Sequence, residues 1–324
     1  MIKTLREHSS TLVLVVLLAC LLYAGMLFWA TSARAVEHLT GLSLSAVAVV
    51  VLLVSAGYLL RFLRWHIYVK QLGYTVPVRA NLRIFLASFL MSISPGKVGE
   101  AVKSYFLREE FDVPVTPTLA GFFCERFTDV LSMILLASSG FLIYPRGALV
   151  MVLILILQLG VLVALQFESI IEQWVFTPLE NLPLFENIVE KFRGFYNDSG
   201  TLLSFKNLSI GTLLGFLSWG LEGLCLGIIL RELGMFSISY PSSVFIFCAA
   251  VLLGAAAMLP GGLGSSEAIM VTMLLFFGAE RAVAVSATIL VRFMTLWYGV
   301  GLGLVAWLLC WRALRFPGDS AEAA

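Results

Sequence analysis

Charge is scarce in this chain. Only 13% of its 324 residues are charged, whereas 60% are hydrophobic and the mean hydropathy is +0.97. A soluble domain of this composition would expose a large apolar surface to water, so a soluble globular protein is excluded. The formal net charge of +1 leaves no basic field that would attract nucleic acid. We therefore expect an all-α, polytopic membrane protein, one domain over residues 1–324, without a nucleic-acid partner.

Signatures of enzymes and metal sites are also missing. The three histidines, His8, His38 and His66, lie far apart along the chain, and the five cysteines occur singly, without C-x-x-C spacing. The glycine-rich stretch 261–264 lacks the Lys-Ser/Thr pair of a phosphate-binding loop. We therefore predict no metal, no cofactor and no catalytic residue, which favours a protein that is not an enzyme.

Long hydrophobic runs are what the chain has instead. A helix needs about 20 apolar residues to cross a bilayer. Windows of that length predict six complete spans, near residues 11–31, 43–64, 118–143, 147–167, 208–231 and 282–311. Two further regions, 79–108 and 241–280, each hold two apolar segments that are too short to cross. We predict that each forms a re-entrant helical hairpin, with its turn protected from lipid by the surrounding protein.

A proline-glycine turn interrupts each of these two regions. The first turn lies in Ser94–Glu100 and the second in Leu259–Glu267. An Arg-Phe pair follows each turn at a matched distance: Arg126 lies 31 residues after Pro95 (126 minus 95) and Arg292 lies 32 after Pro260 (292 minus 260). This recurrence indicates a duplicated unit, with copies at about 79–143 and 241–311.

The loop charges predict how the two copies are oriented. Lys3 and Arg6 precede the first span, a cluster of basic residues within 61–83 follows the second, and Arg312 and Arg315 follow the last. Because cytoplasmic loops carry the excess of Lys and Arg, both termini are expected in the cytoplasm of a multi-pass cell-membrane protein. The first hairpin then enters from the cytoplasm and the second from the opposite face. Inverted repeats with broken helices are a common construction of transporters.

Two smaller regions have interfacial character. Residues 168–207 mix acidic, basic and aromatic residues, which predicts a cytoplasmic interfacial segment, although an ordinary pair of linker helices would have the same pattern. Arg64 and Trp65, at the predicted end of the second span, are interpreted as interfacial anchors.

Ionisable side chains at membrane depth are the strongest chemical signal. Each costs about 3 kcal/mol at the centre of a lone helix, so they must find ion partners, water or a charged substrate. A helix starting after each turn would also direct its free N–H groups into the membrane, which suits a phosphate. Lys97, Arg126 and Arg292 would then bind the anionic part of a lipid, while carboxylates receive an amine, a hydroxyl or a proton. Buried structural ion pairs are the alternative.

Four ordered motifs carry a family resemblance: Ser94–Glu100, Glu125–Asp129, Pro260–Glu267 and Arg292-Phe293. Over about residues 11–312 the chain resembles the lysylphosphatidylglycerol synthase transmembrane-region family of flippase-like proteins. That family includes the membrane domain of the multiple peptide resistance factor, whose implied activity is moving a modified phospholipid between leaflets. For this chain the resemblance implies lipid binding or translocation. Members that aminoacylate lipid append a soluble synthase domain. Because this chain ends at Ala324, shortly after its last predicted span, we expect no aminoacylation by it.

These arguments favour a lipid flippase or transporter whose partners are membrane lipids with anionic head groups. Two alternatives stay open: a membrane enzyme that uses Glu100 or Asp129 as acid or base on a polyprenyl-sugar type of lipid, and a non-transporting partner of a separately encoded lipid-modifying enzyme. Homo-oligomerisation is also open. The candidate substrate-binding residues are Pro95, Gly96, Lys97, Gly99, Glu100, Lys103, Glu125, Arg126, Asp129, Glu222, Pro260, Gly261, Gly262, Gly264, Glu267 and Arg292.

Overall fold

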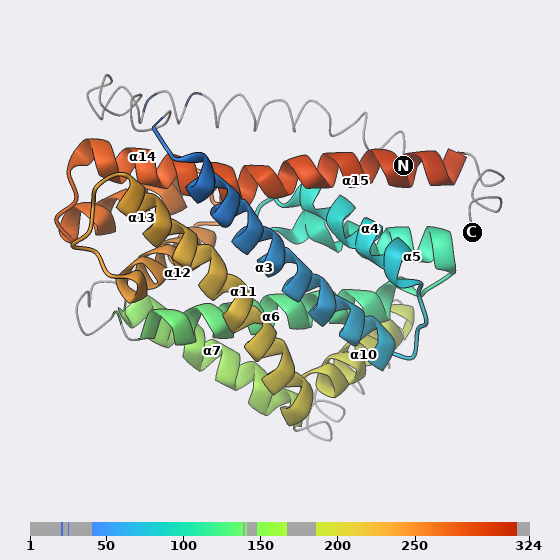
Figure 1. The fold of residues 1–324 in the computed structure, drawn as a ribbon. Coiled ribbons are helices and arrows are strands. Elements are labelled where there is room, and N and C mark those ends of the chain that lie inside the picture. The colour runs from blue at the N-terminus through green and yellow to red at the C-terminus, as the bar shows by residue number, and fades with distance from the viewer. Residues whose placement is uncertain are drawn as a thin grey trace.

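The computed structural model describes residues 41–138, 148–166 and 186–315, with three single positions besides. Apart from positions 21 and 25, the predicted span at 11–31 lies outside these residues, as do residues 168–185 of the predicted interfacial segment. Within them the fold is all-α (Figure 1). The helices are α3 Leu44–Gln71, α4 Val78–Ser88, α5 Val102–Phe111, α6 Val115–Ser138, α7 Ala148–Gln166, α10 Glu186–Leu202, α11 Phe205–Glu232, α12 Tyr240–Ala256, α13 Ser265–Phe276, α14 Arg281–Arg292 and α15 Tyr298–Arg315.

Three stretches in the described part of the chain are long and apolar enough to cross a membrane. They are α3, α11 and the continuous helical stretch Arg281–Leu309, in which a π-helical segment, Phe293–Trp297, joins α14 to α15. The helices α12 and α13 are apolar but shorter. An all-helical membrane protein is therefore confirmed, whereas the number of crossings stays a prediction.

Helix α11 is the centre of the bundle. It packs against α3, α6 and α12, while α15 runs along α4 at the top of Figure 1. The approach of α15 to the chain after α4 depends on Gly303, because a Cβ there would lie 2.4 Å from the backbone nitrogen of Leu90. Serine N-caps begin two helices: Ser43 Oγ accepts from the Ala46 N–H at the start of α3, and Ser239 Oγ accepts from the Ser242 N–H at the start of α12.

Each of the two predicted hairpin regions forms a helix-turn-helix unit, while their re-entry into the membrane stays a prediction. The first consists of α4, the 3₁₀ turn Phe89–Met91, the Pro95 turn, the 3₁₀ turn Val98–Ala101 and α5, while α12 and α13 flank the Pro260 turn. The tips of the two units touch. Pro95 and Pro260 form an isolated antiparallel bridge, and the Gly261 N–H donates to the Ser94 carbonyl at 3.5 Å.

One sequence interpretation is wrong. Helix α3 continues to Gln71, and the Arg64 and Trp65 side chains are completely buried, so they are not interfacial anchors. Arg61 is buried too. The reason is that both arginines pair with carboxylates on other helices, as described below. Arg61 and Arg64 therefore do not lie in a loop, and the predicted orientation no longer has their support. Lys70, at the end of the same helix, is exposed.

Candidate functional site between the two turns

Every buried carboxylate in the described part of the bundle is paired with a cation from another helix or turn. Removing an ionised group from water is costly, and a partner at hydrogen-bond distance offsets much of that cost. The pairs are Arg61 with Glu222 at 2.6 Å, Arg64 with Asp129 at 2.7 Å, Lys103 with Glu125, Arg126 with Glu100 at 3.5 Å, and Arg292 with Glu267 at 2.7 Å. Buried structural ion pairs therefore exist here, as the alternative interpretation expected.

Two of these pairs repeat one another. In each unit the arginine of the Arg-Phe motif pairs with the glutamate that closes the turn of its own hairpin. Each arginine also lies eleven residues after the first residue of its helix, since Arg126 follows Val115 (126 minus 115) and Arg292 follows Arg281 (292 minus 281). The matched sequence spacing thus corresponds to a matched contact.

In the second unit, Glu267 and Arg292 bind each other and the backbone of their own turn. One oxygen of Glu267 accepts from Arg292 Nε at 2.7 Å, and the other accepts from the Gly264 N–H at 2.8 Å, at the start of α13. Arg292 Nη2 donates to the Gly261 carbonyl at 2.7 Å. Glu267 therefore caps a helix and fixes the turn, two structural tasks that occupy both of its oxygens.

The pair in the first unit is more open. The Arg126 side chain is 25% exposed, against 6% for Arg292, and it is shared between Glu100 and Asp129, the latter at 3.1 Å. Glu100 also accepts from Ser92 Oγ at 2.6 Å. Arg126 consequently presents part of its guanidinium to a cavity while its carboxylate partners stay buried.

Lys97 differs from all these cations. Among the described residues, no carboxylate lies within ion-pair distance of its ammonium group. Its Nζ lies 5.2 Å from the centre of the Trp219 ring, and the Arg61 guanidinium carbon lies 4.1 Å from the same ring. Lys97 stands at the first turn in a left-handed backbone conformation, with φ +58°.

A cavity of about 340 Å³ lies where the two turns meet α6 and α12. Lys97, Arg126 and Arg292 all contribute to its lining, as do Asp129 and Trp219. The rest of the lining is mainly apolar, and much of it comes from α6 and α12. These wall residues are Val130, Met133, Val251, Leu252, Ala255, Ala256, Met258 and Leu259. The cavity therefore combines a cationic region with hydrocarbon-like walls.

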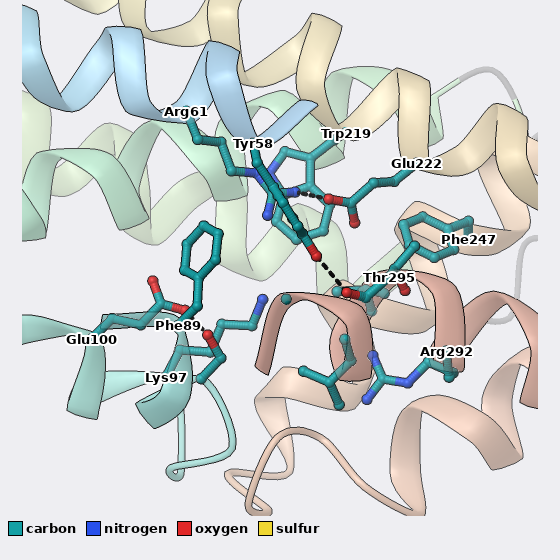
Figure 2. A pocket seen from close by; sticks show the side chains of 14 residues that line it. Tyr58, Arg61, Phe89, Lys97, Glu100, Trp219, Glu222, Phe247, Arg292 and Thr295 are labelled. Atoms are coloured by element: carbon teal, nitrogen blue, oxygen red, sulfur yellow. Dashed lines mark hydrogen bonds and ion pairs between the residues drawn. The ribbon is translucent and has the colours of Figure 1, made fainter. Parts of the chain in front are cut away.

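A second, smaller and more polar cavity adjoins the first, with a volume of about 40 Å³ (Figure 2). Tyr58, Arg61 and Glu222 line it, and it shares Lys97, Trp219, Val251 and Arg292 with the larger cavity. In Figure 2 the Arg61–Glu222 pair and the hydrogen bond from Tyr58 to the Thr295 carbonyl border this space. A volume of this size with polar walls suits one or two water molecules.

The sixteen candidate residues divide into three groups. Seven line the large cavity: Gly96, Lys97, Arg126, Asp129, Gly261, Gly262 and Arg292. Glu100 and Glu222 line only the small one. The other seven line neither cavity: Pro95, Gly99, Lys103, Glu125, Pro260, Gly264 and Glu267.

Lys103 shows why the last group stays apart from the site. Its side chain is fully buried beneath the rings of Trp65, Phe85 and Phe122, in direct contact with Glu125. That pair joins α5 to α6, and neither of its residues lines either cavity.

The sequence matches a family model described as the lysylphosphatidylglycerol synthase TM region, over residues 13–303. The chain belongs to this family. It is also similar to a "UPF0104 membrane protein" of Pyrococcus horikoshii, 25% identical over 318 residues that cover 90% of this chain and 94% of that protein. A "UPF0104 membrane protein" of Methanothermobacter thermautotrophicus is 25% identical over 309 residues, covering 89% of this chain and 90% of that protein. The resemblance drawn from the motifs is thus confirmed.

The sequence alone did not assign four residues to the site that help to build it: Tyr58, Arg61, Arg64 and Trp219. A signal was available for some of them. Tyr58 and Arg61 lie three residues apart on α3, and Trp219 and Glu222 lie three apart on α11, so each pair shares a helix face. Polar residues spaced in this way within long apolar helices predict an inward-facing polar contact.

Proposed function

We propose that this protein binds the head group of a membrane lipid in the large cavity and moves the lipid between leaflets. The observation that carries the proposal is the cavity itself, with Lys97, Arg126 and Arg292 on an otherwise mainly apolar lining. A phospholipid has the same division, because its phosphate needs cationic donors and its acyl chains need hydrocarbon. A small polar solute would leave the apolar walls unused.

The rim of the cavity supports an entry for acyl chains. Met258 and Leu259, beside the second turn, are 58% and 42% exposed, although both belong to the lining of the cavity. Large apolar side chains at such a rim would be unfavourable in water but match the interior of a bilayer. In the proposed arrangement the head group sits at the turns while the chains extend past this rim into the membrane.

The arrangement in the membrane is part of the proposal. Six crossings with both termini in the cytoplasm would bring the two hairpins in from opposite faces, meeting at their turns. The antiparallel contact of Pro95 with Pro260 supports this, because an antiparallel pair has a local two-fold axis, as an inverted repeat requires. The matched Glu–Arg pairs support it as well.

A transport role without chemistry is supported by the state of the two carboxylates that could act as acid or base. Glu100 is held by Ser92 and Arg126. Asp129 Oδ1 accepts from Arg64 and from the Trp219 indole at 3.0 Å, and Oδ2 makes an ion pair with Arg126 at 3.1 Å. A general base must be within hydrogen-bond reach of substrate and keep an oxygen available for its proton. These contacts favour positioning of Arg126 over proton transfer.

The experiment that tests the proposal is lipid exchange in proteoliposomes, followed as the fraction of inner-leaflet head-group-labelled lipid that a membrane-impermeant quencher reaches. Arg126→Gln removes a cation from the cavity, and we expect the exchange rate to fall by about 10- to 100-fold, the value of one charged hydrogen bond. Arg108→Gln is the matched control, because Arg108 is exposed on α5. Exchange that is equal in both variants, with both monodisperse, would contradict the proposal.

A further inference from the structure

The charged residues around the two cavities indicate the net charge that a ligand must carry. We infer that the ligand carries one net negative charge, as a phosphodiester does, and that Lys97 is its counter-ion. This inference rests on the proposed function and narrows its ligand to monoanionic phospholipids, such as those with a glycerol head group. Zwitterionic and amine-modified phospholipids should bind more weakly.

The first step is a charge count. Nine charged groups line the two cavities or pair directly with a group that does. With each group ionised as usual near pH 7, five are cations and four are carboxylates, which leaves an excess of one positive charge. They are Arg61, Arg64, Lys97, Arg126 and Arg292, and Glu100, Asp129, Glu222 and Glu267.

The second step locates the excess. Arg61, Arg64, Arg126 and Arg292 each have a carboxylate within 4.0 Å, and each of the four carboxylates is engaged by at least one of them. Lys97 has no such partner among the described residues. The excess charge therefore resides on the residue that lines both cavities, and Figure 2 shows its side chain extending away from the turn.

The third step concerns the protonation state of Lys97. A lysine in an apolar site can lose its proton and so avoid the cost of an unpaired charge. Here the Trp219 ring lies 5.2 Å from Nζ, and the face of an indole attracts an ammonium group but not a neutral amine. This contact favours the charged form, which has no carboxylate within ion-pair distance among the described residues.

The backbone gives an independent reason to assign Lys97 a ligand. Its φ of +58° is a left-handed conformation that glycine adopts freely and that a lysine adopts only with strain. Strained residues of this kind gather at functional sites, where the surrounding structure holds them. Gly96, next in the chain, has φ +59° without that strain. The side chain of Lys97, which lines both cavities, gives a reason for a lysine in this conformation.

Ligand charge then decides the fit. A phosphodiester monoanion neutralises the site, with Lys97 as the counter-ion and Arg126 as a further donor. A zwitterionic lipid brings a second cation among those already present and leaves the excess in place. A phosphomonoester, with close to two negative charges, would reverse the imbalance.

The test is a binding titration by native mass spectrometry of the purified protein in detergent. The probes are phosphatidylglycerol and phosphatidylcholine with identical acyl chains. We expect phosphatidylglycerol to bind the unmodified protein about 10-fold more tightly than phosphatidylcholine, or tighter still. The Lys97→Met variant should lose that preference, because its affinity for phosphatidylglycerol should fall by about 10- to 100-fold. Lys97→Arg should keep the preference. Lys70→Met, on the exposed end of α3, is the matched control and should change nothing.

The outcomes separate the inference from the proposed function. If Lys97→Met keeps the preference, or if both lipids bind the unmodified protein equally while lipid exchange proceeds, the charge assignment is wrong and transport stands. If neither lipid binds the folded protein, the proposed function fails as well. Soluble glycerophosphoglycerol is added as a competitor. Displacement of the lipid by this compound at concentrations equal to those of the lipid would identify a soluble phosphodiester as the ligand and contradict a lipid site.

Discussion

The two proline-glycine turns share a motif but differ in how much charge they present. The second turn is closed, because Glu267 and Arg292 bind each other and the surrounding backbone. The first turn is open, since Lys97 has no carboxylate partner in the described structure and Arg126 is partly exposed to the large cavity. The second turn therefore holds its arginine tightly within the fold, while the first turn leaves Lys97 and part of Arg126 facing the large cavity.

The position of the glutamate accounts for this difference. Glu267 lies seven residues after Pro260 and three after Gly264, which lets its carboxylate accept from the N–H of Gly264, the residue just before α13. Glu100 lies only five residues after Pro95, and in that turn Ser94 Oγ accepts from the Gly99 N–H at 2.7 Å instead. With the backbone already satisfied by a serine, Glu100 is left to hold Arg126. Two residues of spacing thus separate a capping role from a positioning role.

The largest expected effect is on stability, from removing the glutamate of the closed turn. Glu267→Gln leaves Arg292 buried without a counter-charge, and we expect a loss of about 3 to 5 kcal/mol in the free energy of unfolding. Glu100→Gln should cost less than half of this, because Arg126 keeps Asp129 and is partly exposed. Denaturation midpoints of the two purified variants in the same detergent measure the difference. Equal losses would mean that the two turns are equally closed.

A smaller effect, in the opposite direction, is expected at the two strained non-glycine residues, one in each turn. Lys97 has φ +58° and Met258 has φ +53°. Lys97→Gly and Met258→Gly should each relieve strain, and we expect Lys97→Gly to raise the free energy of unfolding by about 1 kcal/mol.

The two glycine variants should differ in lipid selection. Lys97→Gly removes the proposed counter-ion and should lose the preference for monoanionic lipid, whereas Met258→Gly should keep it. Lipid binding by the two variants, at matched protein stability, measures this. Loss of the preference in both would indicate that the shape of the turns, and not the charge on the first one, selects the lipid.

The sequence was sufficient to predict the helical class, both helix-turn-helix units and the gathering of Lys97, Arg126 and Arg292. These depend on local signals, such as the Pro-Gly turns and the matched Arg-Phe spacing. It was insufficient for Arg61 and Arg64. Their partners are more than 60 residues away, on helices that are hydrophobic around most of their circumference. Such helices have no dominant apolar face, so their pattern does not predict which side meets a neighbour.

Glu267 illustrates a second kind of limit. Its place after the turn marked it as a candidate for binding substrate, yet in the structure both of its oxygens are used within the protein. The spacing from Gly264 to Glu267 matches that of a helix N-cap box, which already favoured the structural role. A carboxylate in this position should be tested as a cap before it is assigned a ligand.

The central claim is that a lipid head group lies where the two turns meet. Phosphatidylglycerol with a photoreactive group on its head group, cross-linked to the purified protein and mapped by peptide mass spectrometry, tests it directly. The account predicts adducts at both turns, within residues 94–97 and 259–262, and their reduction by Lys97→Met but not by Lys70→Met. Adducts confined to exposed apolar helix surfaces, such as that of α7, with none at either turn, would contradict it.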